Sequence, residues 1–180
     1  MSQKLRAESV ELRTLGYLNN RMDLPEKSKQ YYIHLKKGFE GEVMFDSFTQ
    51  KLQCDCIIIN DLLIQINSTT FQVDTLLMLP DTIYLFEVKN YEGDYYYESD
   101  RINKKPKFEI SNPLTQLSRC ESLLRQLLNS LDYKINIDAS VVFINPQFTL
   151  YQAPLDMPFI FPSQINCFFK KVNTTPGKLN

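Results

Sequence analysis

The sequence has no tryptophan and a single histidine, His34, among its 180 residues. Catalytic sites built on paired histidines are therefore excluded, and a serine- or cysteine-based triad would have to use His34. This histidine stands in the run YYIHLKKG, which carries no motif of such a triad. We interpret it as an ordinary histidine on a helix surface and assign it no chemistry.

The four cysteines form no Cys-x-x-Cys pair, and none of them stands near His34 in the sequence. The sequence therefore predicts neither a zinc site nor a disulfide framework. Unpaired thiols are typical of a reducing compartment, so we expect a cytoplasmic location. No apolar run approaches the ~18 residues of a membrane span. The charged first residues, MSQKLRAESVELR, do not fit a secretory signal, and we expect no membrane partner.

The sequence also lacks an excess of charge of either sign. Its 20 basic and 21 acidic residues give a net charge of -1, so bulk attraction cannot hold the protein on nucleic acid. Any such contact needs a local basic patch. The 43% of hydrophobic and 23% of charged residues are typical of one globular domain with a core. No feature of the sequence indicates an oligomeric state.

The first fifty residues carry helix signals. Leucines at helical spacing predict a helix over 4–20. A second helix is expected from Pro25, which suits a first turn, to Lys37, with Gly38 as its C-terminal cap. A third helix is expected to begin near Gly41. Its predicted buried stripe consists of Val43, Met44, Phe48 and Leu52.

The middle of the chain is rich in β-branched and aromatic residues. Three apolar runs, at 56–66, 70–79 and 82–90, are separated by short turn signals. They predict an antiparallel meander of three strands. The polar, tyrosine-rich stretch 91–111 follows, and its segments YYYES and KFEIS are expected to pair as a small side hairpin.

A helix is expected after this stretch, with Asn112 as its N-cap and Pro113 in its first turn. The run 139–145 predicts a buried strand, and the run PFIF (158–161) predicts a weaker one. A helix between two strands allows a right-handed crossover, which places the later strand parallel to its neighbour. The sequence therefore predicts an α/β fold with a mixed sheet flanked by helices.

The short turn after Leu79 sets which residues of the second and third strands face each other. We expect Leu79 to face Thr82. Asp74 then lies directly across from Glu87, with β-carbons roughly 5 Å apart on one face of the sheet. Two carboxylates this close repel each other unless a cation lies between them, and a divalent ion such as Mg²⁺ takes oxygen ligands. A loop one residue longer would slip the register and turn Asp74 to the opposite face.

Lys89 stands two residues beyond Glu87, so it shares that face and lies roughly 7 Å along the strand. The same face is apolar at Ile83 and Leu85 and becomes charged only at its end. A lysine at this position can hold an attacking water or neutralise developing negative charge. The alternative interpretation is that Glu-x-Lys forms an ordinary solvated strand face.

Four short motifs give the sequence a resemblance to the NERD, or nuclease-related, domain over about residues 38–145. They are GFEGE (38–42), QVDTLLML (72–79), YLFEVKNYEG (84–93) and NPLTQ (112–116). The resemblance implies the restriction-endonuclease-like core of the PD-(D/E)XK nuclease superfamily, with the order helix, three strands, helix, strand. We therefore expect an N-terminal helical segment (1–37) like that of bacterial members, a nuclease-like domain (38–172) with a variable insertion (91–111), and a tail (173–180).

The resemblance also implies roles for individual residues. Asp74 and Glu87 would bind Mg²⁺ or Mn²⁺, and Lys89 would position the attacking water or stabilise the transition state. Glu42 would be a further metal ligand or a base that orients the water. Gln116 would contact the site or the substrate.

The backbone carbonyl of Val88 is implied as one more metal ligand. The chain departs from the family pattern at Thr75 and Cys120, where histidines are common, and its insertion lacks the usual tryptophan. None of these departures removes an implied metal ligand.

A basic, tyrosine-rich run lies in the insertion. We interpret it as a grip for nucleic acid, in which cations bind phosphates while tyrosines stack on bases. The alternative is a solvated loop. The residues concerned are Arg101, Lys104, Lys105, Lys107, Tyr95 and Tyr97.

These observations predict a Mg²⁺- or Mn²⁺-dependent nuclease that hydrolyses phosphodiester bonds, with DNA as the expected partner. An alternative is a catalytically weak or inactive module on the same fold that binds nucleic acid or a partner protein. A third is a phosphoesterase for small nucleotides, which requires a closed pocket. Calorimetry with Mg²⁺ and Mn²⁺ and a gel-shift separate the first two, because the module needs no metal affinity and its binding should survive Glu87→Ala.

Overall fold

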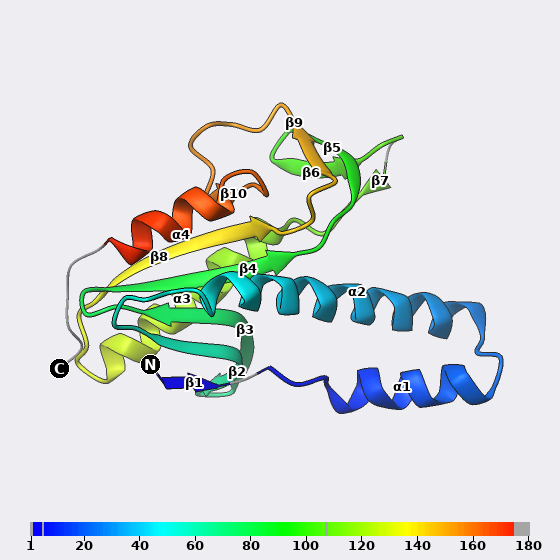
Figure 1. Cartoon of the computed structure of the whole chain (residues 1–180), viewed down its shortest axis with the longest axis horizontal. Coiled ribbons are helices and arrows are strands. Elements are labelled where there is room, and N and C mark those ends of the chain that lie inside the picture. Colours follow the sequence, from blue (N-terminus) through cyan, green and yellow to red (C-terminus); the bar gives the residue numbers. More distant parts are fainter. Residues whose placement is uncertain (1, 5, 107, 175–180) are drawn as a thin grey trace.

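A six-stranded mixed sheet runs through the computed structural model, which describes residues 2–4, 6–106 and 108–174 (Figure 1). In sheet order its strands are β1 (Ser2–Lys4), β2 (Ile57–Ile66), β3 (Thr69–Met78), β4 (Thr82–Lys89), β8 (Asn136–Phe143) and β10 (Phe159–Ile160). The strands β2, β3 and β4 form the predicted antiparallel meander, and β8 pairs parallel to β4 along its whole length. The predicted order of helix, three strands, helix and strand is thus confirmed.

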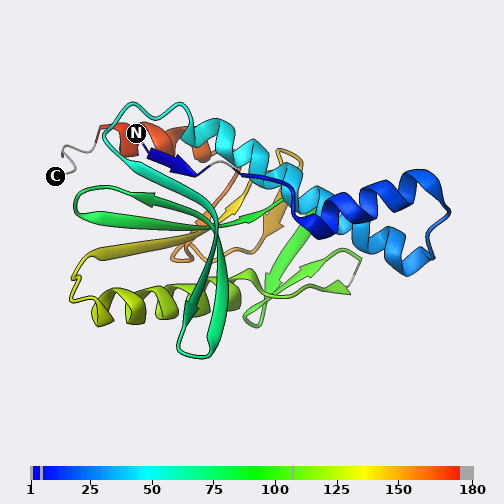
Figure 2. The ribbon, with the colours of Figure 1, turned by 90° about the horizontal axis from the view of Figure 1, so that it is seen from below.

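Helices cover both faces of this sheet (Figure 2). On one face lie α2 (Glu26–Thr49) and α4 (Ile165–Asn173), and on the other lies α3 (Pro113–Ser130), whereas α1 (Val10–Arg21) packs against α2 beyond the sheet. One hydrophobic cluster joins Phe45 of α2 and Phe169 of α4 to Phe86 of β4. A second cluster on the other face joins Leu117 of α3 to Leu85. Residues alternate between faces along a strand, so neighbouring residues of β4 supply both cores.

The N-terminal helices differ from the prediction. Residues 2–4 form β1, parallel to β2, and the first helix begins only at Val10, where Ser9 caps it by accepting a hydrogen bond from the Leu12 amide. Leu5, the first of the leucines that predicted a helix over 4–20, lies outside the described residues. An edge strand on β2 therefore replaces the first part of the predicted helix.

The second and third predicted helices are one continuous helix, α2, which passes through Gly38. A glycine in a helix interior costs only about 1 kcal/mol relative to alanine, which the packing of a long helix outweighs. The predicted buried stripe was wrong at Val43 and Met44, which are 45% and 40% exposed, whereas Phe45 is fully buried. The buried positions instead include Gly41, Phe45 and Thr49, which follow one another four residues apart.

The insertion and the segment after β8 form a separate four-stranded sheet, which rises from the carboxyl ends of β4 and β8 (Figure 1). In sheet order its strands are β7 (Phe108–Glu109), β6 (Arg101–Lys104), β5 (Gly93–Glu98) and β9 (Phe148–Tyr151). Ser99 and Asp100 both have positive φ, which suits a tight two-residue hairpin turn. The YYYES segment belongs to β5, the KFEIS segment contributes β7, and both strands pair with β6. The predicted pairing of these two segments with each other was therefore wrong. The sequence analysis did not predict β9 or α4.

Two glycines of α2 offer a test of this packing. A β-carbon at Gly41 would lie 2.5 Å from the Asn90 β-carbon, whereas one at Gly38 would meet nothing within 4 Å. The Asn90 amide cannot swing aside freely, because it donates to the Lys37 carbonyl and accepts from Asn145. Gly41→Ala should therefore lower the free energy of unfolding by about 1–3 kcal/mol.

The control variant Gly38→Ala should raise the free energy of unfolding by up to about 1 kcal/mol, because alanine is the better helix former. Urea unfolding of both variants beside the parent chain measures the difference. Equal stability of the two alanine variants would contradict the close approach of Asn90 to α2.

Candidate active site

The turn between β3 and β4 has the predicted register. Backbone pairs run from Met78 with Ile83 to Thr75 with Phe86, and the Leu79 amide donates to the Thr82 carbonyl. The loop is therefore two residues long, and the alternative register with a longer loop is excluded.

Asp74 and Glu87 occupy the position at which the β3–β4 backbone ladder ends. Instead of a further backbone pair, the Asp74 carboxylate accepts a hydrogen bond from the Val88 amide at 2.8 Å. Asp74 is 8% exposed and Glu87 is 1% exposed. The two acids are thus buried at the end of the ladder, where the sequence predicted them.

Lys89 lies beside Glu87, and Gln116 of α3 reaches the same amine. The Lys89 Nζ atom is 2.6 Å from Glu87 Oε1 and 3.3 Å from Gln116 Oε1. The glutamine holds the amine from the side of α3, while Glu87 holds it from β4. The amine is therefore fixed at the end of β4 rather than extended into solvent.

Arg6 is a further member of the site that the sequence analysis missed. Its Nη1 atom donates to Glu42 at 2.6 Å, and its Nε and Nη2 atoms donate to the two carboxylate oxygens of Asp46. Nη2 also donates to the Asp74 carbonyl and to Thr75 Oγ1. The side chain is 2% exposed, so this buried guanidinium connects α2 to β3 directly beside the two acids.

The surroundings raise the pKa values of all three candidate ligands. Burial, and then the charge of Asp74, raise the pKa of Glu42 to about 7 although Arg6 lowers it. Burial and Asp74 likewise raise the pKa of Glu87 to about 7 against the effect of Lys89. Burial raises the pKa of Asp74, which the Val88 amide opposes. Arg6 and Lys89 therefore do not fully offset the cost of ionising the buried acids.

Lys89 keeps its charge in this setting. Burial lowers the pKa of its amine, but Glu87 outweighs burial and raises that pKa above the ordinary value. A protonated amine beside acids with raised pKa values is an arrangement found at functional sites more often than elsewhere.

The five predicted side chains line one cleft of about 550 Å³. They are Glu42, Asp74, Glu87, Lys89 and Gln116. The cleft also contains Lys104 and Tyr95 of the predicted nucleic-acid grip, but neither Arg101, Lys105 nor Tyr97 lines it. Lys107 lies outside the described residues.

The predicted role of the tyrosines requires correction. Tyr95 and Tyr97 are 4% and 8% exposed and belong to the hydrophobic cluster on the α3 side, because alternate residues of β5 point inward. Their rings are therefore not free to stack on bases. Arg101 pairs with Glu109 at 2.8 Å, and the Lys105 amine lies 4.1 Å from the centre of the Tyr151 ring.

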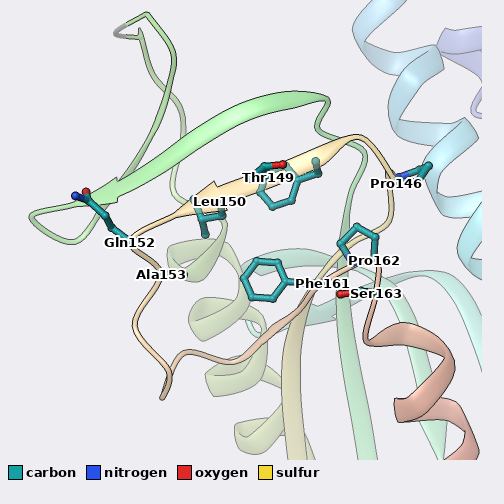
Figure 3. Close-up of a pocket in the computed structure, with 9 residues that line it drawn as sticks. Pro146, Thr149, Leu150, Gln152, Ala153, Phe161, Pro162 and Ser163 are labelled. Atoms are coloured by element: carbon teal, nitrogen blue, oxygen red, sulfur yellow. The ribbon is translucent and has the colours of Figure 1, made fainter.

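A second hollow, of about 480 Å³, lies between β9 and the segment that follows β10 (Figure 3). Its lining residues in the described chain carry no charged side chain. They are Pro146, Phe148, Thr149, Leu150, Gln152, Ala153, Phe161, Pro162 and Ser163. Of these two hollows, only the first therefore offers acidic and basic side chains.

The acids of the first cleft fit a hard divalent cation. Their donors are carboxylate oxygens, and burial and mutual repulsion disfavour their ionised forms, so a cation between them would relieve the unfavourable charge. Within the described residues, no three acidic, histidine or cysteine side chains are already grouped as a metal site. Glu42 instead bonds to Arg6, and Glu87 to Lys89.

The family model of the nuclease-related domain, NERD, matches residues 37–144. The chain belongs to the nuclease-related domain family. The fold of this NERD domain is accordingly α/β with a restriction-endonuclease-like core, as predicted. No curated protein matches the chain. The crystal structure of protein VC1899 from Vibrio cholerae is similar, with 10% sequence identity and a TM-score of 0.41. The match covers 83% of this chain and 36% of VC1899, so this chain spans about a third of the length of VC1899.

The two positions at which the resemblance led us to expect a histidine, Thr75 and Cys120, lie near the acids. Thr75 accepts a hydrogen bond from Arg6, and Cys120 of α3 is buried with its thiol 3.4 Å from the Gln72 carbonyl. His34 is exposed on α2, as predicted, although it lies at the edge of the cleft. None of the helices in the described part of the chain is both long and apolar enough to cross a bilayer.

The raised pKa of Glu87 predicts how stability changes with pH. A carboxyl with a raised folded-state pKa binds more protons in the folded than in the unfolded chain between about pH 4.5 and 7, so its ionisation destabilises the fold as pH rises through that window. Glu87→Gln should therefore raise the free energy of unfolding of the metal-free protein by about 1–3 kcal/mol at pH 8.

The gain from Glu87→Gln should be much smaller at pH 5, near the lower end of that window, where the folded parent keeps this carboxyl protonated. Glu121→Gln, at a glutamate that pairs with Arg125 on α3, serves as the control and should show no such trend. Chemical unfolding at both pH values measures the effect. A constant difference between Glu87→Gln and the parent across this range would be the contrary result.

Proposed function

We propose that this NERD domain is a metal-dependent nuclease that hydrolyses phosphodiester bonds in DNA. The observation that carries the proposal is the convergence of Asp74, Glu87 and Lys89 at one cleft, with two buried acids and one fixed amine at the end of the β3–β4 ladder. Membership of a nuclease-related family supports the same class of chemistry.

Three carboxylates and one backbone carbonyl would hold the metal. Mg²⁺ or Mn²⁺ bound by Asp74 and Glu87, with Glu42 and the Val88 carbonyl as further ligands, would activate a water molecule and neutralise charge on the phosphate. The donors fit because they are oxygen atoms and because the carboxylates are incompletely compensated by Arg6 and Lys89. The protein itself supplies the fixed geometry of these donors.

Lys89 would act on the reacting groups directly. Its protonated amine, held between Glu87 and Gln116, would donate hydrogen bonds to the attacking water or to a non-bridging phosphate oxygen. As an alternative to binding the metal, Glu42 would orient the water and accept the proton that the water loses as its oxygen bonds to phosphorus. The phosphorus–oxygen bond to the leaving strand breaks in the same displacement.

Substitutions in the cleft test the catalytic proposal. Lys89→Ala and Glu87→Ala should each lower Mn²⁺-dependent cleavage of labelled DNA by about 100-fold or more, because each removes a preorganised charge at the reacting phosphate. The matched controls Lys170→Ala on α4 and Glu121→Ala on α3 should cleave like the parent. Parent protein that leaves single- and double-stranded DNA intact with both metals would refute the proposal.

A binding module without turnover is the second candidate, because Glu42 and Glu87 already have cationic partners in Arg6 and Lys89. Calorimetry separates the two candidates. A nuclease should bind Mn²⁺, and Asp74→Asn should reduce that affinity at least ten-fold because it removes one carboxylate ligand. A parent protein that binds no metal, yet shifts DNA in a gel equally well after Glu87→Ala, would support the binding module instead.

A further inference from the structure

The small sheet presents a row of three side chains to the cleft. Tyr95 of β5 pairs directly with Lys104 of β6, which pairs directly with Phe108 of β7. Directly paired residues of neighbouring strands project to the same face of a sheet. All three line the same cleft as Glu87 and Lys89. The row therefore runs along the cleft lining from the buried Tyr95 to the exposed Phe108.

The two aromatic rings of this row differ in their surroundings. Tyr95 is 4% exposed and stacks on Tyr91, with ring centres 5.4 Å apart. Phe108 is 69% exposed. Between them, the Lys104 amine lies 5.6 Å from the centre of the Tyr95 ring. The outer end of the row thus combines an uncovered apolar ring with a cation that is exposed to solvent.

A ring and an adjacent cation are the two groups that recognise an unpaired nucleotide. An aromatic side chain stacks on the face of a base, and an amine binds the phosphate of the backbone. In a duplex both faces of an internal base are covered by its neighbours, so the ring can reach only an unpaired base. The rings to which the sequence analysis assigned stacking, those of Tyr95 and Tyr97, are buried, whereas the Phe108 ring of the same insertion is exposed.

We propose that Phe108 and Lys104 form a subsite for one unpaired nucleotide, so that the substrate class of the cleft is single-stranded nucleic acid. The proposal rests on the proposed function, since it takes the cleft to be a nucleic-acid site. It goes further in naming the strand form and the residues that select it. The ring binds the base, the amine binds its phosphate, and the adjoining phosphate extends toward Lys89.

Because the chain has no tryptophan, a tryptophan introduced at position 108 gives a fluorescence signal from that position alone. Phe108→Trp places a single tryptophan in the subsite, and stacking of a base should quench its fluorescence. The titrant is oligodeoxythymidylate, in buffer with a chelator so that no strand is cleaved. The control is Tyr133→Trp, at an aromatic residue that is 66% exposed and does not line the cleft, and it should not be quenched.

Affinity measurements test the same subsite without a new chromophore. By fluorescence anisotropy, Phe108→Ala should weaken binding of labelled oligodeoxythymidylate roughly ten-fold or more, while Tyr133→Ala should bind like the parent. Phe108→Tyr should restore affinity because it restores a ring. Lys104→Ala should weaken binding and reduce the slope of log affinity against log salt by about 0.7, the loss of one phosphate contact.

The outcomes distinguish this subsite from the catalytic proposal. Binding that depends on Phe108 in a protein that cleaves nothing would leave the subsite in place and remove only the catalysis. Equal binding by Phe108→Ala and the parent, or no binding of the oligonucleotide by the parent, would overturn the subsite. An equal loss of affinity for blunt duplex DNA would overturn its preference for unpaired bases.

Discussion

The burial of two acids at the end of the β3–β4 ladder is the constraint to which the rest of this structure responds. At Asp74 a backbone pair is replaced by a hydrogen bond that the Val88 amide donates to the Asp74 carboxylate. Glu87, which the strand register places directly opposite Asp74, is almost completely buried. Ionised carboxylates in such a place are costly unless cations or hydrogen bonds compensate them. Two cations far apart in the sequence supply part of that compensation, Lys89 at both acids and Arg6 at Asp74.

Arg6 gives the N-terminal segment a part in the site. It bonds to Glu42 and Asp46 of α2 and to the backbone and side chain of β3 at Asp74 and Thr75. The family match begins at residue 37, so this arginine lies outside the region that the family shares. The N-terminal segment therefore contributes to the site, because the Arg6 side chain links α2 to the acid-bearing strand β3.

The sequence predicted those parts of the site that depend on local geometry. The register of β3 with β4 follows from a two-residue turn and the alternation of a strand, so Asp74, Glu87 and Lys89 could be placed on one face in advance. Arg6 could not, because its contacts span 36 to 69 residues and leave no periodic signal. The extent of α2 was misjudged because Gly38 resembles a cap.

The insertion shows a similar limit. Its tyrosines, basic residues and strand character were visible in the sequence, but which ring is uncovered depends on strand pairing. The tight turn at Ser99 and Asp100 makes β6 the partner of β5 and leaves β7 at the sheet edge. Tyr95 is then covered by neighbouring aromatic rings, and Phe108 is not.

The connection between the two sheets would let one cleft combine the proposed reaction chemistry with the proposed strand recognition. β4 ends at Lys89 and β5 begins at Gly93, so only three residues separate the amine from the small sheet. One of them, Tyr91, contacts Phe143 of the main sheet and Tyr95 of the small one. The two sheets are therefore held at a fixed distance by a short connection and a shared aromatic cluster. Sequence changes at the outer strands β6 and β7 can alter what the cleft binds while the acids and the amine stay in place.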